Sequence, residues 1–497
     1  MEPNTLHPDL GPLAAEVVER IGKPVDYLHV AAALEVLGLT DQVVRDRYGQ
    51  PDTFSLARRL LSHCHMCPES PIIVDNRRSE DFDWKLLLIS CARGSLFVLP
   101  VAVSLVVLVL SQGSFWGDFK DRPAAANSMA MALVISMIIS GGFGRALVAR
   151  IVESVSSGIT AGLLRTAVFT AAIALLLTGI STLLVSLALG ESIDRLTIFP
   201  VSLDLVLLWM GLFVLYSIHR EWLFVPALIS GVATAIALKM SVLLGYVGVY
   251  LLSTMVMAVV VLGTGLILLA RLKSDEGSNI ALEPGPWWLR LYPGQFLFGV
   301  IYFGILFADR LENWSAGDGF LFNPAYEASL DFAMFSLFIG AGVLEYRMVR
   351  FWQSIFTSRR ETDKSVSSRM TRFLFNSFCV YGVTALVGMT VSLVLASMLD
   401  AGQDTVTVGL AAASYLLLVW GSFACSLYLG LRRWTVVLVA GATALTVDVG
   451  VGLLVRGVDP ALTVTGLLAG SLAFFILGTL PLVRLAKNFS YYQYSSS

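Results

Sequence analysis

The chain has 497 residues, of which 56% are hydrophobic and only 14% are charged, and its formal net charge is -2. Its mean hydropathy of +0.76 lies far from the balance of an ordinary soluble domain. A water-soluble globular fold is therefore excluded for most of the chain. The small net charge gives no reason to expect a nucleic-acid partner, because in so apolar a chain the positions of Lys and Arg matter more than their total.

Residues 1–85 differ from the rest, since they are polar and lack the apolar stretch behind Met1 that a cleavable signal requires. Apolar spacing near 3.6 in residues 13–21, 27–37 and 54–61 predicts short helices, with N-caps at Thr40-Asp41 and Asp52-Thr53. We expect a small cytosolic helical region. It has little room for a core of its own and is expected to dock on cytoplasmic loops or on a partner.

A short run of His and Cys, His63-Cys64-His65-Met66-Cys67, ends this region. Its CxxC spacing could offer ligands to zinc, but so few consecutive residues cannot supply four ligands to one tetrahedral ion, and no second pair follows. His63, Cys64 and Cys67 are therefore weak metal candidates. The favoured alternative is a reduced cysteine pair at a helix end, and a zinc ion shared between two chains stays open. We predict no metal and no cofactor.

Residues 86–483 read as twelve apolar segments separated by charge, Gly or Pro. About 20 apolar residues are needed for a helix to cross about 30 Å of hydrocarbon with its backbone hydrogen bonds satisfied. The sequence therefore predicts an all-α polytopic membrane protein. The predicted spans are 86–111, 128–143, 166–189, 198–218, 223–243, 249–270, 295–311, 329–347, 373–399, 406–431, 436–455 and 462–483.

The distribution of the 34 Lys and Arg predicts the orientation of these spans. Most lie in the terminal regions and in every second loop, and the densest group follows the eighth predicted span (Arg347, Arg350, Arg359, Arg360, Lys364, Arg369 and Arg372). Positive loops face the cytoplasm, so both termini are expected there, in a multi-pass protein of the cytoplasmic (inner) membrane. The predicted domains are a cytosolic region (1–85), two six-helix transmembrane lobes (86–275 and 286–486) and a cytosolic tail (487–497).

An internal similarity relates the second span to the eighth. Residues 136–150 align without gaps on residues 336–350, matching Ser136, Gly142 and Arg150 with Ser336, Gly342 and Arg350. A shift of six spans gives two halves of like orientation, a pattern that secondary transporters use to enclose a midplane cavity. The alternative is coincidence, because small residues and an exit arginine recur in unrelated spans.

Sequence signatures of powered or catalytic chemistry are missing. The chain contains no G-x-x-x-x-G-K-[ST] loop, no H-E-x-x-H and no G-x-S-x-G. We therefore expect no enzyme and no ATPase. Any transport would depend on an ion gradient, the membrane potential or the push of a growing polymer.

Ionisable residues inside apolar spans point to a pathway, because an unpaired charge in hydrocarbon costs at least about 2.5 to 3.5 kcal/mol. Asp448, near the middle of the eleventh span, is expected either to face a watery cavity or to pair with a cation. Arg93 in the first span is a second cavity candidate. For Asp204 and Lys239, which lie closer to span ends, a hydrated carboxylate and a snorkelling amine are competing explanations.

Another group of candidates spans the end of the seventh span and the whole of the eighth: Asp309, Arg310, Trp314, Tyr326, Glu327 and Glu345. This part resembles the Pel-type exopolysaccharide transporters, PelG-like members of the superfamily that includes multidrug exporters and lipid-linked oligosaccharide flippases. In that family the seventh span ends in an Asp-Lys-type pair followed by aromatic residues, a Tyr-Asp-like step follows, and the eighth span closes with Glu before a basic loop. Here Arg310 replaces Lys, Glu327 replaces Asp, and residues 1–85 are an addition.

The resemblance implies export or flipping of a polysaccharide or lipid-linked saccharide, beside a cytoplasmic glycosyltransferase and other membrane subunits of an export complex. It implies sugar contacts from Tyr, Trp and acidic groups. Asp309, Glu312 and Asp331 would then attract a cationic amino sugar toward an outer mouth. The competing explanation is an interfacial belt, where Trp and Tyr gather in a membrane protein whatever its cargo.

Two other functions remain open from the sequence. A membrane scaffold that recruits a polysaccharide synthase would account for the cytosolic region equally well. A polytopic glycosyltransferase would need an acidic site on an outer loop, for which Asp118 and Asp121 are candidates in a short loop.

Overall fold

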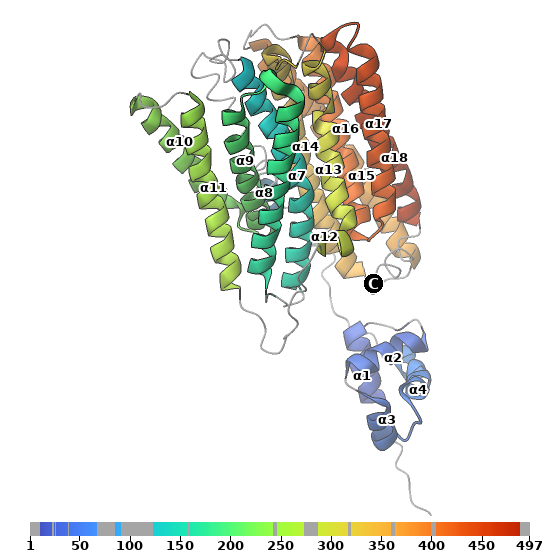
Figure 1. Ribbon diagram of the computed structural model, residues 1–497. Helices are drawn as coiled ribbons and strands as arrows, with labels where there is room; N and C mark the ends of the chain where they lie inside the picture. Colours follow the sequence, from blue (N-terminus) through green and yellow to red (C-terminus); the bar gives the residue numbers. More distant parts are fainter. Residues whose placement is uncertain are drawn as a thin grey trace, which may run out of the picture. The chain divides into compact units, whose positions relative to one another are not determined.

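The computed structural model describes residues 10–66, 85–90, 123–241, 246–272, 287–358, 363–398 and 404–487, apart from positions 22–23, 25, 38, 157–159, 161 and 317–319. All regular elements in these residues are helices, so the predicted all-α class is confirmed (Figure 1). The chain divides into two compact units. One comprises Met1–Asp83 with Arg350–Val366, and the other comprises Trp84–Val349 with Ser367–Ser497.

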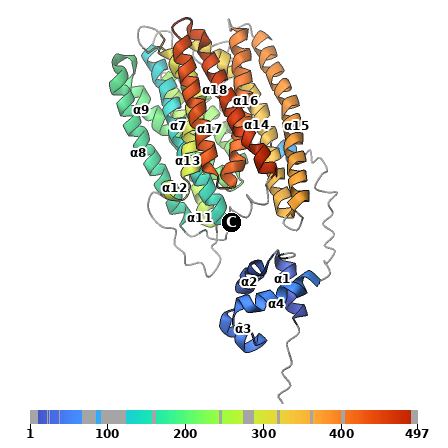
Figure 2. The same ribbon diagram turned by 90° about the vertical axis from the view of Figure 1, so that its right-hand side faces the viewer.

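The N-terminal segment of the smaller unit, in its described residues, forms four helices: α1 (Gly11–Ile21), α2 (Tyr27–Val36), α3 (Asp41–Tyr48) and α4 (Thr53–Met66) (Figure 2). Their apolar faces meet in a core that includes Val17, Leu34, Val44 and Leu60, so the expectation that this region has little room for a core of its own was wrong. These helices are short, so most of their stability comes from burying this shared face and little from helix propensity.

Two aspartates organise the ends of these helices. Asp52 caps α4, accepting the backbone N–H of Ser55 at 2.6 Å. Thr40 precedes α3 without a side-chain cap bond, and the Asp41 carboxylate instead accepts from Thr53 N at 2.8 Å and Thr53 Oγ1 at 2.7 Å, joining α3 to α4. The backbone N–H and hydroxyl of Thr53 hold the pKa of Asp41 below its ordinary value of 3.8.

Eleven helices in the described residues are long and apolar enough to cross a membrane. They correspond to the second through twelfth predicted spans. They are α7 (Pro123–Ser156), α8 (Leu163–Leu189), α9 (Arg195–Ser217), α10 (Phe224–Ser241), α11 (Tyr246–Arg271), α13 (Pro293–Trp314), α14 (Pro324–Ser358), α15 (Asp363–Met398), α16 (Thr405–Gly430), α17 (Trp434–Val455) and α18 (Val464–Lys487). Of the first predicted span, only residues 85–90 are described, and they are helical. The remainder of that span and the loop with Asp118 and Asp121 lie outside the described residues.

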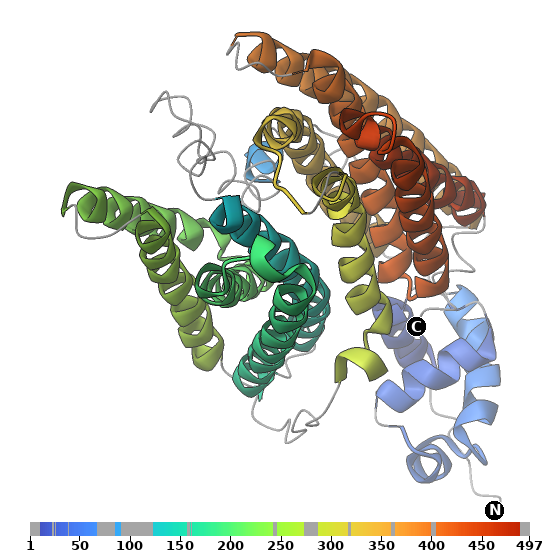
Figure 3. The same ribbon diagram turned by 45° about the horizontal axis from the view of Figure 1, so that its top comes forward.

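Short helical turns connect several spans: η2 (Gly190–Ser192), η3 (Glu221–Leu223), α12 (Trp287–Arg290) and η4 (Pro460–Thr463). The helices α7–α11, here called the first group, lie together, and so do α13–α18, the second group. Figure 3 shows the green helices of the first group on one side and the orange to red helices of the second group on the other. Helix α9 contacts α7, α8 and α11 in the first group, and α18 contacts α16 and α17 in the second.

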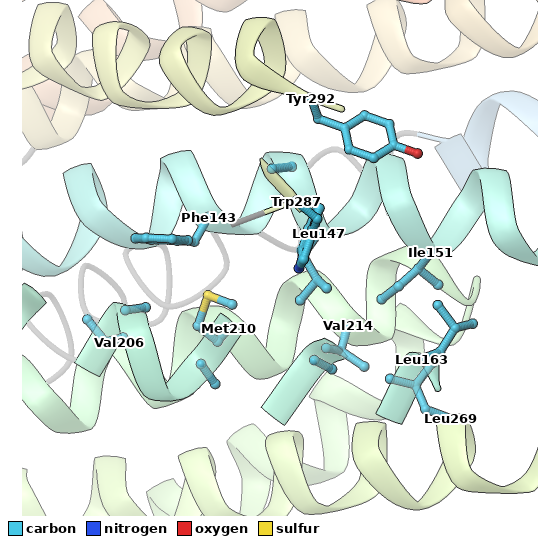
Figure 4. Packing of buried hydrophobic residues seen from close by; sticks show 14 residues of the cluster. Phe143, Leu147, Ile151, Leu163, Val206, Met210, Val214, Leu269, Trp287 and Tyr292 are labelled. Atoms are coloured by element: carbon cyan, nitrogen blue, oxygen red, sulfur yellow. The ribbon is translucent and has the colours of Figure 1, made fainter. Parts of the chain in front are cut away.

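A buried apolar cluster holds the first group together. Figure 4 shows Phe143, Leu147 and Ile151 of α7 beside Val206, Met210 and Val214 of α9, with Leu163 of α8 and Leu269 of α11. Trp287 and Tyr292, which lie just before the second group, join the same cluster. The connection between the two groups is thus anchored in the core of the first.

The N-terminal ends of α9 and α16 have the same construction. Asp194 precedes α9 and accepts the hydroxyl of Thr197 at 2.6 Å, and Asp404 precedes α16 and accepts the hydroxyl of Thr407 at 2.7 Å. Each aspartate also caps a backbone N–H two residues later, at 3.0 and 3.1 Å. These two helices are the fourth and tenth predicted spans, six apart.

Their C-terminal ends match as well. His219 after α9 and Arg432 after α16 both have φ +55°, a left-handed conformation that is uncommon outside glycine. The following backbone N–H returns to the carbonyl five residues earlier, at 2.9 and 2.8 Å, as in a Schellman motif. The same caps at both ends of helices six spans apart support the internal repeat independently of the alignment of residues 136–150.

The two groups meet along α7 and α13. At their crossing, a Cβ on Gly299 would collide with the carbonyl of Gly141, so only glycine allows this approach. Helix α7 continues past the C-terminal end of the predicted second span, 128–143, through the glycine pair 141–142 to Ser156. Glycine here serves close helix packing and does not end the helix.

Candidate functional site

Arg310 is the centre of a buried polar network near the end of α13, and only 2% of it is exposed. Its Nε donates to Glu327 Oε2 on α14 at 3.0 Å, and its Nη2 donates to Tyr415 Oη on α16 at 3.0 Å. Its Nη1 donates to the carbonyl of Leu306 at 2.7 Å and lies 3.8 Å from Asp309 Oδ1. One planar guanidinium therefore connects three helices and offsets part of the negative charge around it.

Asp309 is fully buried and is held by a second chain of hydrogen bonds. Tyr326 on α14 donates its hydroxyl to Asp309 Oδ2 at 2.7 Å, and Thr463 in η4 donates to Tyr326 Oη at 3.2 Å. Nearby, Asn323 donates to Asn313 Oδ1 at 3.1 Å. The seventh and eighth predicted spans thus meet through the residues that the sequence singled out.

Asp448 and Glu312 extend this network without being satisfied by it. Asp448 on α17 is 0% exposed, and neither carboxylate of the two has a hydrogen-bond partner among the described residues. Glu312 lies against Gly452, where any Cβ would collide with its carboxylate, and a Cβ on Gly470 of α18 would lie 2.6 Å from Asp448 Cβ. Asp309 and Glu312 are both electrostatic neighbours of Asp448.

The result is an acidic cluster, defined by Asp309, Glu312, Glu327 and Asp448. Arg310 pairs with Asp309 and Glu327, and Asp309 is the electrostatic neighbour of Glu312 and Asp448. Arg456 is a second cation near Glu312 and donates to a neighbouring serine hydroxyl. Burying a carboxylate without a partner is costly unless it takes up a proton or a cation.

Asp309 and Glu312 do not face an outer mouth, since 0% and 5% of these residues are exposed. Their burial differs from the exposed position that attraction of a cationic sugar at an outer mouth would require. Sequence placed both at a span end, whereas α13 continues past them to Trp314 and neighbouring helices cover them.

Trp314 and Glu345 lie outside the acidic cluster. Trp314 is 3% exposed, and its ring packs 5.8 and 5.5 Å from the rings of Phe320 and Phe322, so it covers the end of α13. Glu345, much further along α14, accepts the hydroxyl of Tyr216 on α9 at 3.0 Å and so connects the two groups. These two candidates therefore belong to different places in the fold.

The remaining candidates do not join either place. Asp204 is buried in the first group, where Thr254 donates to its Oδ2 and its Oδ1 has no partner among the described residues. Arg93 and Cys67 lie outside the described residues. Cys64 is buried in the core of the four-helix unit, 3.9 Å from the carbonyl of Ala14, while His63 is exposed.

Sequence reasoning missed Tyr415, Thr463 and Arg145. Tyr415 and Thr463 reach the cluster from elements 105 and 137 residues away from their partners, and a hydroxyl in an apolar span gave no local signal. Arg145 was placed beyond the end of the second span, although it lies within α7. The alignment of residues 136–150 with 336–350 could have indicated Arg145, because it places this residue opposite the candidate Glu345.

Comparison with solved structures shows the fold of a transporter class. The chain is similar to a multidrug resistance MATE family transporter of the MOP superfamily in an inward-facing conformation, with a TM-score of 0.53 and 13% identity over 83% of this chain and 96% of that one. It is also similar to the eukaryotic MATE transporter AtDTX14, with a TM-score of 0.50 and 15% identity over 80% and 96% of the two chains. No protein-family model and no curated protein sequence matches it. At these identities the likeness shows that the chain has the fold of the MATE transporters.

Proposed function

We propose that this protein is an ion-coupled membrane transporter that exports or flips a polysaccharide or lipid-linked saccharide across the cytoplasmic membrane. A fold shared with MATE transporters supports movement of a solute, and a second group that repeats features of the first supports two halves working against each other. The proposal places both termini in the cytoplasm, as the positive loops indicate.

The observation that carries the proposal is Asp448, a fully buried residue whose two carboxylate oxygens have no partner among the described residues. Retaining such a group costs stability, and intramembrane ionisable residues are by default candidates for ion or proton pathways. Binding of a proton or cation at the acidic cluster would neutralise it. Exchange of that ion between the two sides would then provide the driving force that no ATPase motif in the chain supplies.

The nature of the cargo rests on the resemblance to Pel-type transporters. Tyr326 and Glu327, which that resemblance implies as sugar contacts, are engaged with Asp309 and Arg310. We therefore assign them to positioning the coupling site and place the cargo between the two groups of helices. A cytoplasmic glycosyltransferase and further export subunits are the proposed partners.

The proposal is tested by measuring export of surface polysaccharide in cells from which the gene for this protein is deleted and in cells that carry the wild type, Asp448→Asn or Gly450→Ala. The three proteins are compared at matched membrane levels. Gly450 is two residues away on α17, and a Cβ there meets nothing within 4 Å, so Gly450→Ala is a matched control. We expect the deletion and Asp448→Asn to lower export at least about tenfold, with saccharide accumulating inside or on its lipid carrier.

A different pattern would favour the scaffold. If the deletion abolished the polymer while Asp448→Asn exported as well as Gly450→Ala, the ion-coupling role would be contradicted. Recruitment of a synthase by the cytosolic region would then explain the deletion.

A further inference from the structure

Arg145 is a cation at the boundary between the two groups of helices. It lies about three turns before the end of α7, a helix that is long and apolar enough to cross a membrane. Its guanidinium lies 4.6 Å from the ring centroid of Phe298 and 5.8 Å from that of Tyr302, both on α13. Contacts of this kind stabilise the cation through the ring faces but leave its edge N–H donors available.

Arg145 differs from Arg310 in having no carboxylate partner. In the part of the chain that the structure describes, no acidic oxygen lies within 4.0 Å of its guanidinium, and it donates no hydrogen bond. Its side chain is nevertheless only partly buried. An arginine in this state inside a span is costly, and a ligand that supplies the missing oxygens would offset that cost.

The electrostatic neighbours of Arg145 come from four other helices: Tyr302 (α13), Tyr216 (α9), Cys425 (α16) and Glu345 (α14). Glu345 already accepts the hydroxyl of Tyr216. In the alignment of residues 136–150 with 336–350, Arg145 and Glu345 occupy equivalent positions. The repeat therefore sets an arginine and a glutamate on corresponding spans. Glu345 acts on Arg145 electrostatically but accepts its hydrogen bond from Tyr216, so the N–H donors of Arg145 have no carboxylate within bonding distance among the described residues.

We propose that Arg145, with the rings of Phe298 and Tyr302, forms a binding site between the two groups for an oxyanion of the transported saccharide. The oxyanion is the carboxylate of an acidic sugar or the phosphate of a lipid carrier, because guanidinium binds either through paired N–H donors. The aromatic rings would offer apolar faces to the adjoining sugar. This inference rests on the proposed function and specifies the class of substrate.

Titration of the purified full-length protein with defined probes tests the site. The probes are trigalacturonate, undecaprenyl phosphate, neutral maltotriose and the cationic trimer of glucosamine. The proteins are wild type, Arg145→Gln, Arg145→Lys and, as a matched control, Arg165→Gln, which removes an exposed arginine from α8 in the same group. Size-exclusion elution and thermal unfolding establish that each variant is folded.

We expect an anionic probe to bind wild type and Arg165→Gln about tenfold to a hundredfold more tightly than maltotriose does. Arg145→Gln should lose that preference, and Arg145→Lys should keep part of it. If Arg145→Gln fails to fold, the weakened preference of Arg145→Lys tests the site instead. Selection of trigalacturonate assigns the oxyanion to the sugar, and selection of undecaprenyl phosphate assigns it to the carrier.

Two results would contradict the site. In the first, the wild-type protein binds neither anionic probe more tightly than maltotriose, or binds the cationic trimer most tightly. In the second, the preference for an anionic probe stays unchanged in both Arg145 variants. Export in cells separates this failure from failure of the proposed function. If cells with Arg145→Gln export normally while cells that lack the protein do not, only the oxyanion site is contradicted. Normal export by cells that lack the protein would contradict the proposed transport function itself.

Discussion

Arg310 is the residue on which the second group depends most for electrostatic balance. Replacing it with Leu would leave the buried carboxylates of Glu327 and Asp309 without their cation. Removal of one partner from a buried pair costs about 3 to 5 kcal/mol. We expect Arg310→Leu to lose stability of that order in unfolding titrations in mixed micelles, and Arg310→Leu combined with Glu327→Leu to recover part of it.

The control for this prediction is Arg432→Leu, which removes an arginine paired with Glu153 at 3.4 Å on side chains that are 73% and 50% exposed. Exposed pairs contribute up to about 1 kcal/mol. If Arg310→Leu cost no more than Arg432→Leu, the guanidinium would not be the organising group of the acidic cluster.

The sequence identified the charged residues of the site, but it did not predict which residues they contact. A charge in an apolar run is conspicuous, so Asp309, Arg310 and Asp448 could be selected directly. Their partners could not be selected, because Tyr415 and Thr463 come from distant elements and carry no charge. Burial was also hidden, since the predicted span ends at residue 311 whereas α13 continues to Trp314.

Helix packing between the two groups gives a prediction for α13. A Cβ on Gly299 would collide with the backbone carbonyl of Gly141, and two backbones cannot shift as a side chain can. Overpacking of this kind costs about 1 to 3 kcal/mol. We expect Gly299→Ala to lower the thermal unfolding temperature of the purified protein, while Gly450→Ala, with open space around it, leaves that temperature unchanged or raises it. Equal stability of the two variants would contradict the close approach of α7 and α13.

Helices α3 and α4 of the four-helix unit give a prediction about pH. Because Thr53 holds the pKa of Asp41 below 3.8, the ionised carboxylate stabilises the folded unit fully above that pH, and the contribution is lost as pH falls toward the lower folded-state value. We expect backbone amides of α3 and the start of α4 to lose hydrogen-exchange protection over this acid range. Asp41→Asn should remove that dependence, and Asp46→Asn, an exposed change on the same helix, should retain it. Identical acid profiles in the wild type and Asp41→Asn would show that this contact is not responsible.

Element positions were largely predictable, whereas element ends were not. Apolar composition located the second through twelfth spans, because hydrocarbon thickness fixes their length. The ends depended on contacts: α7 passes through its glycine pair because α13 lies against it. The caps Asp194 and Asp404 were local signals that sequence reasoning did not use, and they support the internal repeat better than the short alignment does.

For the whole molecule, the two groups are connected at both ends of α7. At one end the Asn127 amide donates to the carbonyls of Ser192 and Phe320 at 2.9 and 3.0 Å and accepts from Phe322 N at 2.7 Å. At the other end Glu153 accepts the hydroxyl of Tyr292. With the Tyr216–Glu345 hydrogen bond, these contacts join the two groups, while the acidic cluster lies within the second group.

The most direct measurement is labelling of Asp448 in the purified protein with dicyclohexylcarbodiimide, which reacts with protonated carboxyl groups in apolar surroundings, followed by peptide mass spectrometry across pH. The account predicts labelling at acid pH that declines as pH rises or as a competing cation is added. It should be absent in Asp448→Asn and normal in Gly450→Ala. Labelling that stayed the same at every pH and salt, or no labelling at any pH, would contradict the claim that this buried carboxylate exchanges the coupling ion.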